Sequence, residues 1–276
     1  MKLRRARRRG PSPERQAAAQ GRAEPQQPPA FVFVVTYGRS GSTLVQGLLN
    51  ALPGTTVRGE NGFFVWELFE AHRRATSFAE AHASHRPRKV ESAFYGAHLV
   101  TEERIEPLER SLLLGLLINE KRRRPAHVGF KEVLWHRIPP EDTEEFFGWF
   151  ERVFPGSRYV LNTRAMEDAS SSGFWRSYDR DEALAAMRRV VEIQDYLRAT
   201  RPERVFDTRY EVITGPDREA SEAALRGLAE FVTGRARPQV IERMRGVLEV
   251  GHGPHPFKAS GKASGKAAAP QRASDG

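Results

Sequence analysis

The feature that most constrains the fold is a short apolar run at residues 31–35, followed directly by TYGRSGST at 36–43. A helical pattern over 42–52 comes next, with apolar side chains recurring on one face. These are Leu44, Val45, Leu48, Leu49 and Leu52. Pro53 and Gly54 end the pattern. Such a strand turns through small residues straight into a helix, a layout that proteins use to hold phosphate groups.

Further strand-like and helical runs alternate along the chain. We expect strands at 31–35, 127–135, 157–164 and 204–210, and helices at 42–52, 61–75, 106–124, 141–154, 181–200, 217–233 and 238–248. The apolar run 112–118 suits a buried helix. Alternation of this kind predicts an α/β fold, a P-loop NTPase-like single domain with a mostly parallel central sheet flanked by helices. The loops after the strands should converge at one sheet edge, where ligands bind.

The net charge of +9 comes from the two ends of the chain. Residues 31–257 hold 32 basic and 32 acidic side chains, so the central part is neutral. The ends, 1–30 and 258–276, are basic, rich in Ala, Gly, Pro, Ser and Gln, and free of aromatic residues, which predicts disordered tails. We therefore place the folded domain at 31–257. The tails have the charge to contact nucleic acid or anionic lipid surfaces, without specificity.

Cysteine is absent from the chain, which excludes disulfides and thiolate chemistry. No apolar stretch reaches the length of a transmembrane segment, and no apolar h-region follows the basic start. The sequence alone therefore predicts a soluble cytoplasmic protein.

The glycine-rich turn is built for an anion. Gly38 and Gly41, with the small side chains Ser40 and Ser42, let backbone N–H groups approach a ligand at a helix start. An ordinary strand-to-helix turn remains the alternative.

Mg-ATP is not the expected ligand of this turn. The G-x-x-x-x-G-K-[ST] order is missing, and Arg39 stands earlier in the turn instead of the lysine. The strand YVLNTR ends in Asn162, Thr163 and Arg164 rather than in a magnesium-binding Asp.

Four segments in order resemble the sulfotransferases that use 3′-phosphoadenosine 5′-phosphosulfate (PAPS). TYGRSGSTL resembles their 5′-phosphosulfate loop, and YVLNTRAMEDASSSGFW (159–175) resembles their 3′-phosphate element. RGENGFF (58–64) is similar to the segment that supplies a general-base Glu in the carbohydrate and tyrosylprotein branches, and GFKE (129–132) is similar to a strand end of bacterial carbohydrate-type members. The likeness runs from about residue 31 to 175, and more loosely to about 250.

The resemblance implies PAPS as cofactor, with 3′,5′-adenosine bisphosphate as its product and no metal. The 5′ side would be bound by the turn, that is by Gly38, Arg39, Ser40, Gly41, Ser42 and Thr43. Arg164 and Ser172, eight residues apart, would hold the 3′-phosphate, with Ser171 as an alternative if the register shifts.

The acceptor hydroxyl needs a base, and the resemblance implies Glu60, with His136 as its rival. A partner of Arg58 or an aid to a helix N-cap is the structural alternative for Glu60. Lys131 would stabilise the sulfuryl oxygens, as Arg39 would the leaving phosphate, or would simply pair with Glu132.

The expected function is transfer of a sulfuryl group to a hydroxyl of a carbohydrate, glycolipid or similar acceptor. A phenol or a peptide tyrosine is the alternative acceptor, and residues 61–124 should shape the choice. Two competing functions remain: a P-loop nucleotide kinase or other phosphotransferase, and a basic-tailed nucleic-acid-binding protein. The tryptophans (66, 135, 149 and 175) are expected in the core, with adenine stacking as the alternative; His252 and His255 lack a third ligand for a metal.

Overall fold

The computed structural model describes residues 29–118 and 125–249. Its strands are β1 (Ala30–Val35), β2 (Thr55–Arg58), β3 (His127–Glu132), β4 (Arg158–Thr163) and β5 (Val205–Arg209). Its helices are α2 (Ser42–Asn50), α3 (Phe64–Ala81), α4 (Glu102–Leu117), α5 (Thr143–Val153), α6 (Met166–Ser170), α7 (Arg180–Thr200), α8 (Tyr210–Thr214), α9 (Arg218–Thr233) and α10 (Pro238–Glu249).

The strands form one sheet in the order β2-β3-β1-β4-β5, and every pairing is parallel. The first strand is therefore central, and the loop that follows it emerges between the ends of β3 and β4. Val34 pairs with Lys131 on one side and with Val160 on the other. The expected single α/β domain with a parallel sheet is confirmed.

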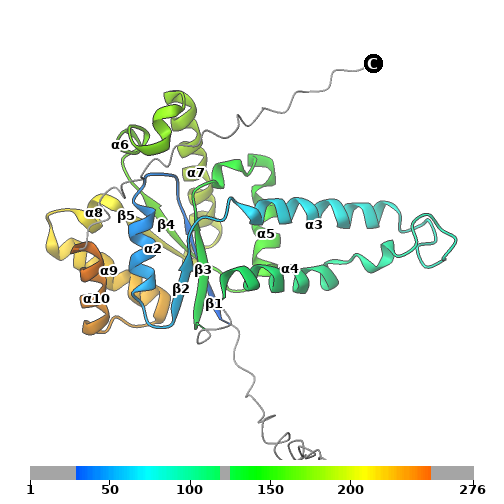
Figure 1. The fold of residues 1–276 in the computed structure, drawn as a ribbon, viewed down its shortest axis with the longest axis horizontal. Coiled ribbons are helices and arrows are strands. Elements are labelled where there is room, and N and C mark those ends of the chain that lie inside the picture. Colours follow the sequence, from blue (N-terminus) through cyan, green and yellow to red (C-terminus); the bar gives the residue numbers. More distant parts are fainter. Residues whose placement is uncertain (1–28, 119–124, 250–276) are drawn as a thin grey trace, which may run out of the picture.

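Helices cover both faces of the sheet, which explains why β1 is apolar at every position. Phe31, Phe33 and Val35 point into a core shared with α5 and α7. Val32 and Val34 point into a second core, shared with α2, α9 and α10. The result is a three-layer structure with the β1–α2 loop at its upper edge in Figure 1.

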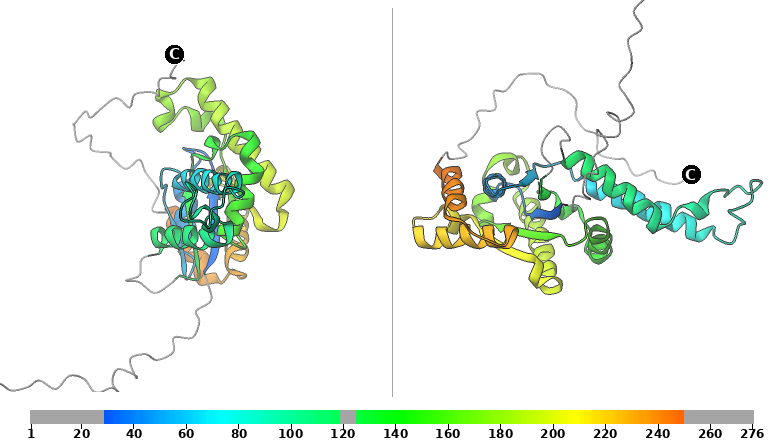
Figure 2. Two further views of the ribbon diagram at one scale, coloured as in Figure 1. Left: turned by 90° about the vertical axis from the view of Figure 1, so that its right-hand side faces the viewer. Right: turned by 90° about the horizontal axis from the view of Figure 1, so that it is seen from below.

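Helices α3 and α4 extend away from the sheet as an arm, seen from three directions in Figures 1 and 2. At its base a buried polar cluster ties the two helices to α5. His72 Nδ1 lies 3.1 Å from a Glu109 carboxylate oxygen, and Trp149 Nε1 donates to the other oxygen at 3.0 Å. The polar atoms of this buried cluster therefore satisfy one another.

Several boundaries differ from those expected. The edge strand β2 is missing from the expected set, because its four residues, TTVR, are too few to show a period. Strand β3 stops at Glu132, and Trp135 already begins a 3₁₀ turn. Helix α3 continues to Ala81, and α4 begins at Glu102, with Pro107 tolerated inside it.

The expectation of a buried helix at 112–118 is wrong for part of the run. Leu113 and Leu117 are buried, but Leu112 and Leu116 are 48% and 59% exposed. The run fills two faces of α4, and only one of them meets the rest of the protein.

Within residues 29–118 and 125–249, no helix is long and apolar enough to cross a membrane. Residues 1–28 and 258–276 of the expected tails, as well as His252 and His255, lie outside the described residues. Ala30, expected at the end of the first tail, already belongs to β1.

Candidate anion-binding and catalytic site

The turn after β1 is held in shape by buried hydrogen bonds among Thr36, Ser40 and Asn162. Thr36 Oγ1 lies 2.6 Å from Ser40 Oγ and donates to the Asn162 carbonyl at 2.8 Å. The Asn162 side chain in turn donates to Ser40 Oγ at 3.0 Å and to its carbonyl at 2.9 Å. Ser40 is fully buried, so its hydroxyl shapes the turn and does not face a ligand.

Two residues of the turn have left-handed backbone, Arg39 (φ 68°) and Gly41 (φ 81°). Gly41 stands at the N-cap position of α2 and offers no side chain to cap it. The first N–H groups of α2, from Ser42 and Thr43, therefore face outward, where the helix dipole favours an anion. Ser42 is buried, whereas Thr43 is exposed.

Aromatic rings pack on both glycines of the turn. A Cβ on Gly38 would collide with the Phe174 ring, and one on Gly41 with the Tyr210 ring. Trp175 Nε1 donates to the Gly38 carbonyl at 2.9 Å. The glycines are thus required by the walls of the site as well as by its backbone.

The two segments expected to bind the two phosphate positions meet directly. Arg39 Nε donates to Ser172 Oγ at 3.1 Å, across 133 residues of chain. Ser171 instead bonds to the Glu167 carbonyl at 2.8 Å. Of the two serines, the structure thus brings Ser172 to the turn.

Arg164 lies at the same point. Its Nη1 donates to the Arg39 carbonyl at 3.3 Å, and its guanidinium lies 4.6 Å from the centre of the Tyr210 ring. Its Nε is buried and has no hydrogen-bond partner among the described residues. Tyr37 exchanges hydrogen bonds with the Arg164 backbone, accepting from its N–H at 2.9 Å and donating to its carbonyl. A buried guanidinium N–H without an acceptor fits an anionic ligand.

Sequence reasoning missed Tyr37, Phe174 and Tyr210 as parts of this site. Tyr37 lies inside the quoted turn motif, so its position was a usable signal. Tyr210 directly follows β5, and in a parallel sheet that position lies at the same edge as the turn.

Lys131 and Glu60 form an ion pair at the β3 end of this edge. Lys131 is buried, whereas the Glu60 side chain is 51% exposed. Arg58 is not the partner of Glu60, because its Nε donates to the Leu117 carbonyl at 2.9 Å. Nor does Glu60 cap α3, since Asn61 Oδ1 accepts from the Phe64 N–H at 3.1 Å.

The alternative pairing of Lys131 with Glu132 is wrong. Neighbouring residues of a strand point to opposite faces, and the Glu132 carboxylate is fully buried. It accepts from four backbone N–H groups, those of Asn61, Phe63, Val133 and Leu134, at 2.8 to 3.3 Å. This carboxylate is therefore saturated and is not available to a metal ion.

His136 lies in the 3₁₀ turn after β3, with its ring 6.3 Å from that of Trp175. Its Nδ1 is buried and unpaired within the described residues. Burial lowers the pKa of the imidazole below its usual value. The ring is therefore neutral near pH 7 and chemically able to accept a proton.

The four tryptophans serve mainly to pack the interior. Trp135, Trp149 and Trp175 are buried, and Trp66 is partly buried against the same core. Trp175 alone touches the turn, through its hydrogen bond to Gly38.

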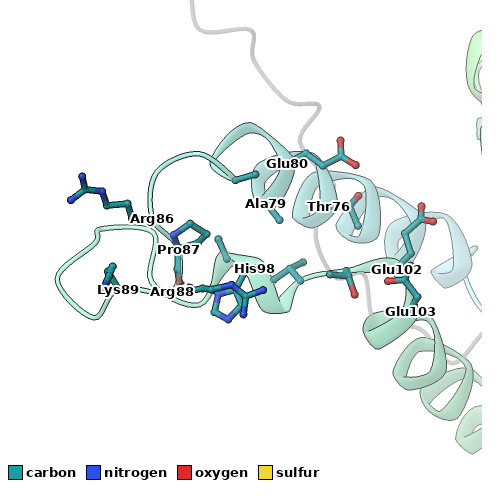
Figure 3. Close-up of a pocket in the computed structure, with 14 residues that line it drawn as sticks. Thr76, Ala79, Glu80, Arg86, Pro87, Arg88, Lys89, His98, Glu102 and Glu103 are labelled. Carbon is teal, nitrogen blue, oxygen red and sulfur yellow. Dashed lines mark hydrogen bonds between the residues drawn. The ribbon is translucent and has the colours of Figure 1, made fainter.

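Two pockets lie on the arm side of the molecule. The larger, about 800 Å³, lies near the tip of the arm, between the end of α3 and the start of α4 (Figure 3). The smaller, about 200 Å³, is lined by residues 58–61, three leucines of α4 and Phe130. Of these two pockets, the smaller one includes Glu60.

Comparisons with known proteins add little. No protein-family model matches the chain, and no curated protein matches it. Among solved structures, sulfotransferase STF9 from Mycobacterium avium is similar, with a TM-score of 0.44 and 15% sequence identity over 87% of this chain and 72% of that one. Similarity at this level does not establish a function, so the proposal below depends on this chain's own residues.

Proposed function

We propose that the protein is a PAPS-dependent sulfotransferase that acts on a hydroxyl of a carbohydrate, glycolipid or similar acceptor. One observation carries the proposal: the turn at 36–43 and the segment 164–172, far apart in sequence, meet through Arg39, Ser172 and Arg164. Two cationic groups at one helix start suit a ligand with phosphate at two positions.

Each side chain has a defined task in this proposal. Arg39, Ser42, Thr43 and the backbone at Gly38, Ser40 and Gly41 bind the 5′ side. Arg164 and Ser172 bind the 3′-phosphate, and the buried Arg164 Nε–H gains an acceptor there. Bound PAPS supplies the sulfuryl group, and 3′,5′-adenosine bisphosphate is the product.

The transfer itself falls to the groups at the end of β3. Glu60 would take the proton of the acceptor hydroxyl as that oxygen receives the sulfuryl group. Lys131, buried against that carboxylate, neutralises charge on the sulfuryl oxygens. His136 is the alternative base. We propose that Arg39 and Lys131 neutralise the charge that magnesium neutralises in phosphoryl transfer.

A magnesium-dependent phosphotransferase is less well supported. The turn has no lysine at the position such enzymes use, and the buried Glu132 carboxylate is fully occupied by backbone N–H groups.

Calorimetric titration with 3′,5′-adenosine bisphosphate in EDTA tests the proposal, with ADP as the competing ligand. We expect the bisphosphate to bind more tightly than ADP and Arg164→Ala to weaken it about 10-fold to 100-fold, since a charge-assisted hydrogen bond contributes roughly 1.5–3 kcal/mol. Arg218→Ala, at an exposed arginine on α9, is the matched control. Equal binding of ADP, or binding only with magnesium, would overturn the proposal.

A further inference from the structure

Helix α4 carries a row of exposed leucines. Leu108, Leu112 and Leu116 are 69%, 48% and 59% exposed, and their four-residue spacing places them on one face. Their neighbours Leu113 and Leu117 are buried on the side that meets the core. The helix is thus apolar on two sides, and the outer side is uncovered in the described part of the chain.

The row formed by Leu116, Leu112 and Leu108, called the leucine row below, begins with Leu116 at the base of the arm. Leu116 lines the 200 Å³ pocket together with Glu60, and Leu113, Leu117 and Phe130 supply the pocket's other apolar surface. The hydrogen bond from Arg58 to the Leu117 carbonyl fixes the end of α4 against this pocket. From Leu116 the row continues outward for eight residues, about 12 Å along the helix.

We propose that the leucine row binds the apolar chain of the acceptor. The acceptor is then an amphiphile whose hydroxyl-bearing head lies beside Glu60 and whose alkyl or acyl chain runs over Leu116, Leu112 and Leu108. This inference rests on the proposed sulfotransfer, because it is the position of the base that identifies the head end.

One observation favours a chain over other occupants. The row is continuous with the pocket that contains Glu60, as a substrate path must be, whereas an assembly surface has no reason to end there. A sugar without a chain would leave the leucines exposed to water.

The test is a series of alkyl β-glucosides from methyl to decyl, each used below its micelle concentration, with PAPS as donor. We expect kcat/KM to rise roughly twofold to fourfold for each methylene that reaches the row, the range for partial to full burial of a CH₂ group. The rise should level off once the chain passes Leu108.

Leu112→Gln and Leu116→Gln should flatten this dependence on chain length. Leu99→Gln is the matched control, an exposed leucine of the arm that lies outside α4, and it should keep the wild-type dependence. Calorimetric titration of the same proteins with decyl glucoside measures binding to the leucine row without turnover. Titration with 3′,5′-adenosine bisphosphate measures the nucleotide site separately.

The outcomes separate the two proposals. Equal kcat/KM for methyl and decyl glucoside, or decyl glucoside binding that both α4 variants retain, would overturn the leucine row. A dimer in light scattering that these variants break apart would overturn it too. If the wild type does not bind 3′,5′-adenosine bisphosphate, the proposed function is overturned instead. Binding of decyl glucoside to the wild type and to the α4 variants would then test by itself whether the leucine row binds a chain.

Discussion

At the scale of single residues, the two members of the Glu60–Lys131 ion pair differ most clearly in their exposure to solvent. The buried lysine holds one oxygen of a carboxylate that is otherwise half in solvent. The carboxylate is thus oriented without being enclosed, which suits the proposed role of a base that must meet an exchanging acceptor.

Glu60→Gln should leave the affinity for 3′,5′-adenosine bisphosphate near that of the wild type and lower turnover about 10²-fold to 10⁴-fold, because the amide cannot take up the proton. Turnover with an active alkyl glucoside and bisphosphate titration measure the two effects. Glu67→Gln, at an exposed residue of α3, is the control. Full activity in Glu60→Gln would show that Glu60 is not the base. His136 would then be the proposed base, and His136→Gln should lower turnover instead.

At the scale of elements, the Glu132 carboxylate joins β3 to the start of α3. Its four backbone donors come from both sides of the junction, two from the residues after β3 and two from the loop that carries Glu60. A single side chain thereby sets where Glu60 stands relative to Lys131.

Glu132→Gln should lower the free energy of unfolding by about 1–3 kcal/mol, because the amide NH₂ group faces donors that then lack an acceptor. That corresponds to a drop in Tm of roughly 2–12 °C for a domain of this size, measured by thermal unfolding. Glu144→Gln, on the exposed side of α5, should change Tm by less than about 2 °C. Equal Tm values for the two variants would contradict the structural role of Glu132.

The elements also show how far sequence reasoning reaches. The central strands and α2 follow directly from apolar runs and periodicity, because they are buried on defined faces. The short edge strand β2 gives no such signal, and neither does a 3₁₀ turn. Side-chain pairing is harder still: Glu132 follows Lys131 in sequence, yet the strand pleat turns it to the opposite face.

At the scale of the whole molecule, two histidines connect protonation to stability. Burial lowers the pKa of His136, and burial together with Arg158 lowers the pKa of His127. In the unfolded chain the two histidines therefore bind protons below their usual pKa of about 6.5. In the native protein they stay neutral until the pH falls to their lower native pKa values. Stability is fully present above that pH and is lost as the pH falls toward the native pKa values.

Urea unfolding between pH 7.5 and 5.5 should show this loss, with a slope of at most about 1.4 kcal/mol per pH unit for each histidine. His136→Gln should make the decline shallower, and His85→Gln, at the exposed tip of the arm, should not. A decline of unchanged steepness in His136→Gln would assign the pH dependence to other groups.

The long-range contacts that shape the turn also have a consequence for the order of events during synthesis. Thr36 depends on Asn162, Arg39 on Ser172, and the Val35 carbonyl on Gln194, across 126, 133 and 159 residues. At about 5–20 residues per second, the ribosome makes Gln194 roughly 8–32 s after Val35. A nascent chain that ends before Asn162 carries the whole glycine-rich motif but lacks every one of these contacts, so the turn can take its described form only after the chain has been made as far as Gln194.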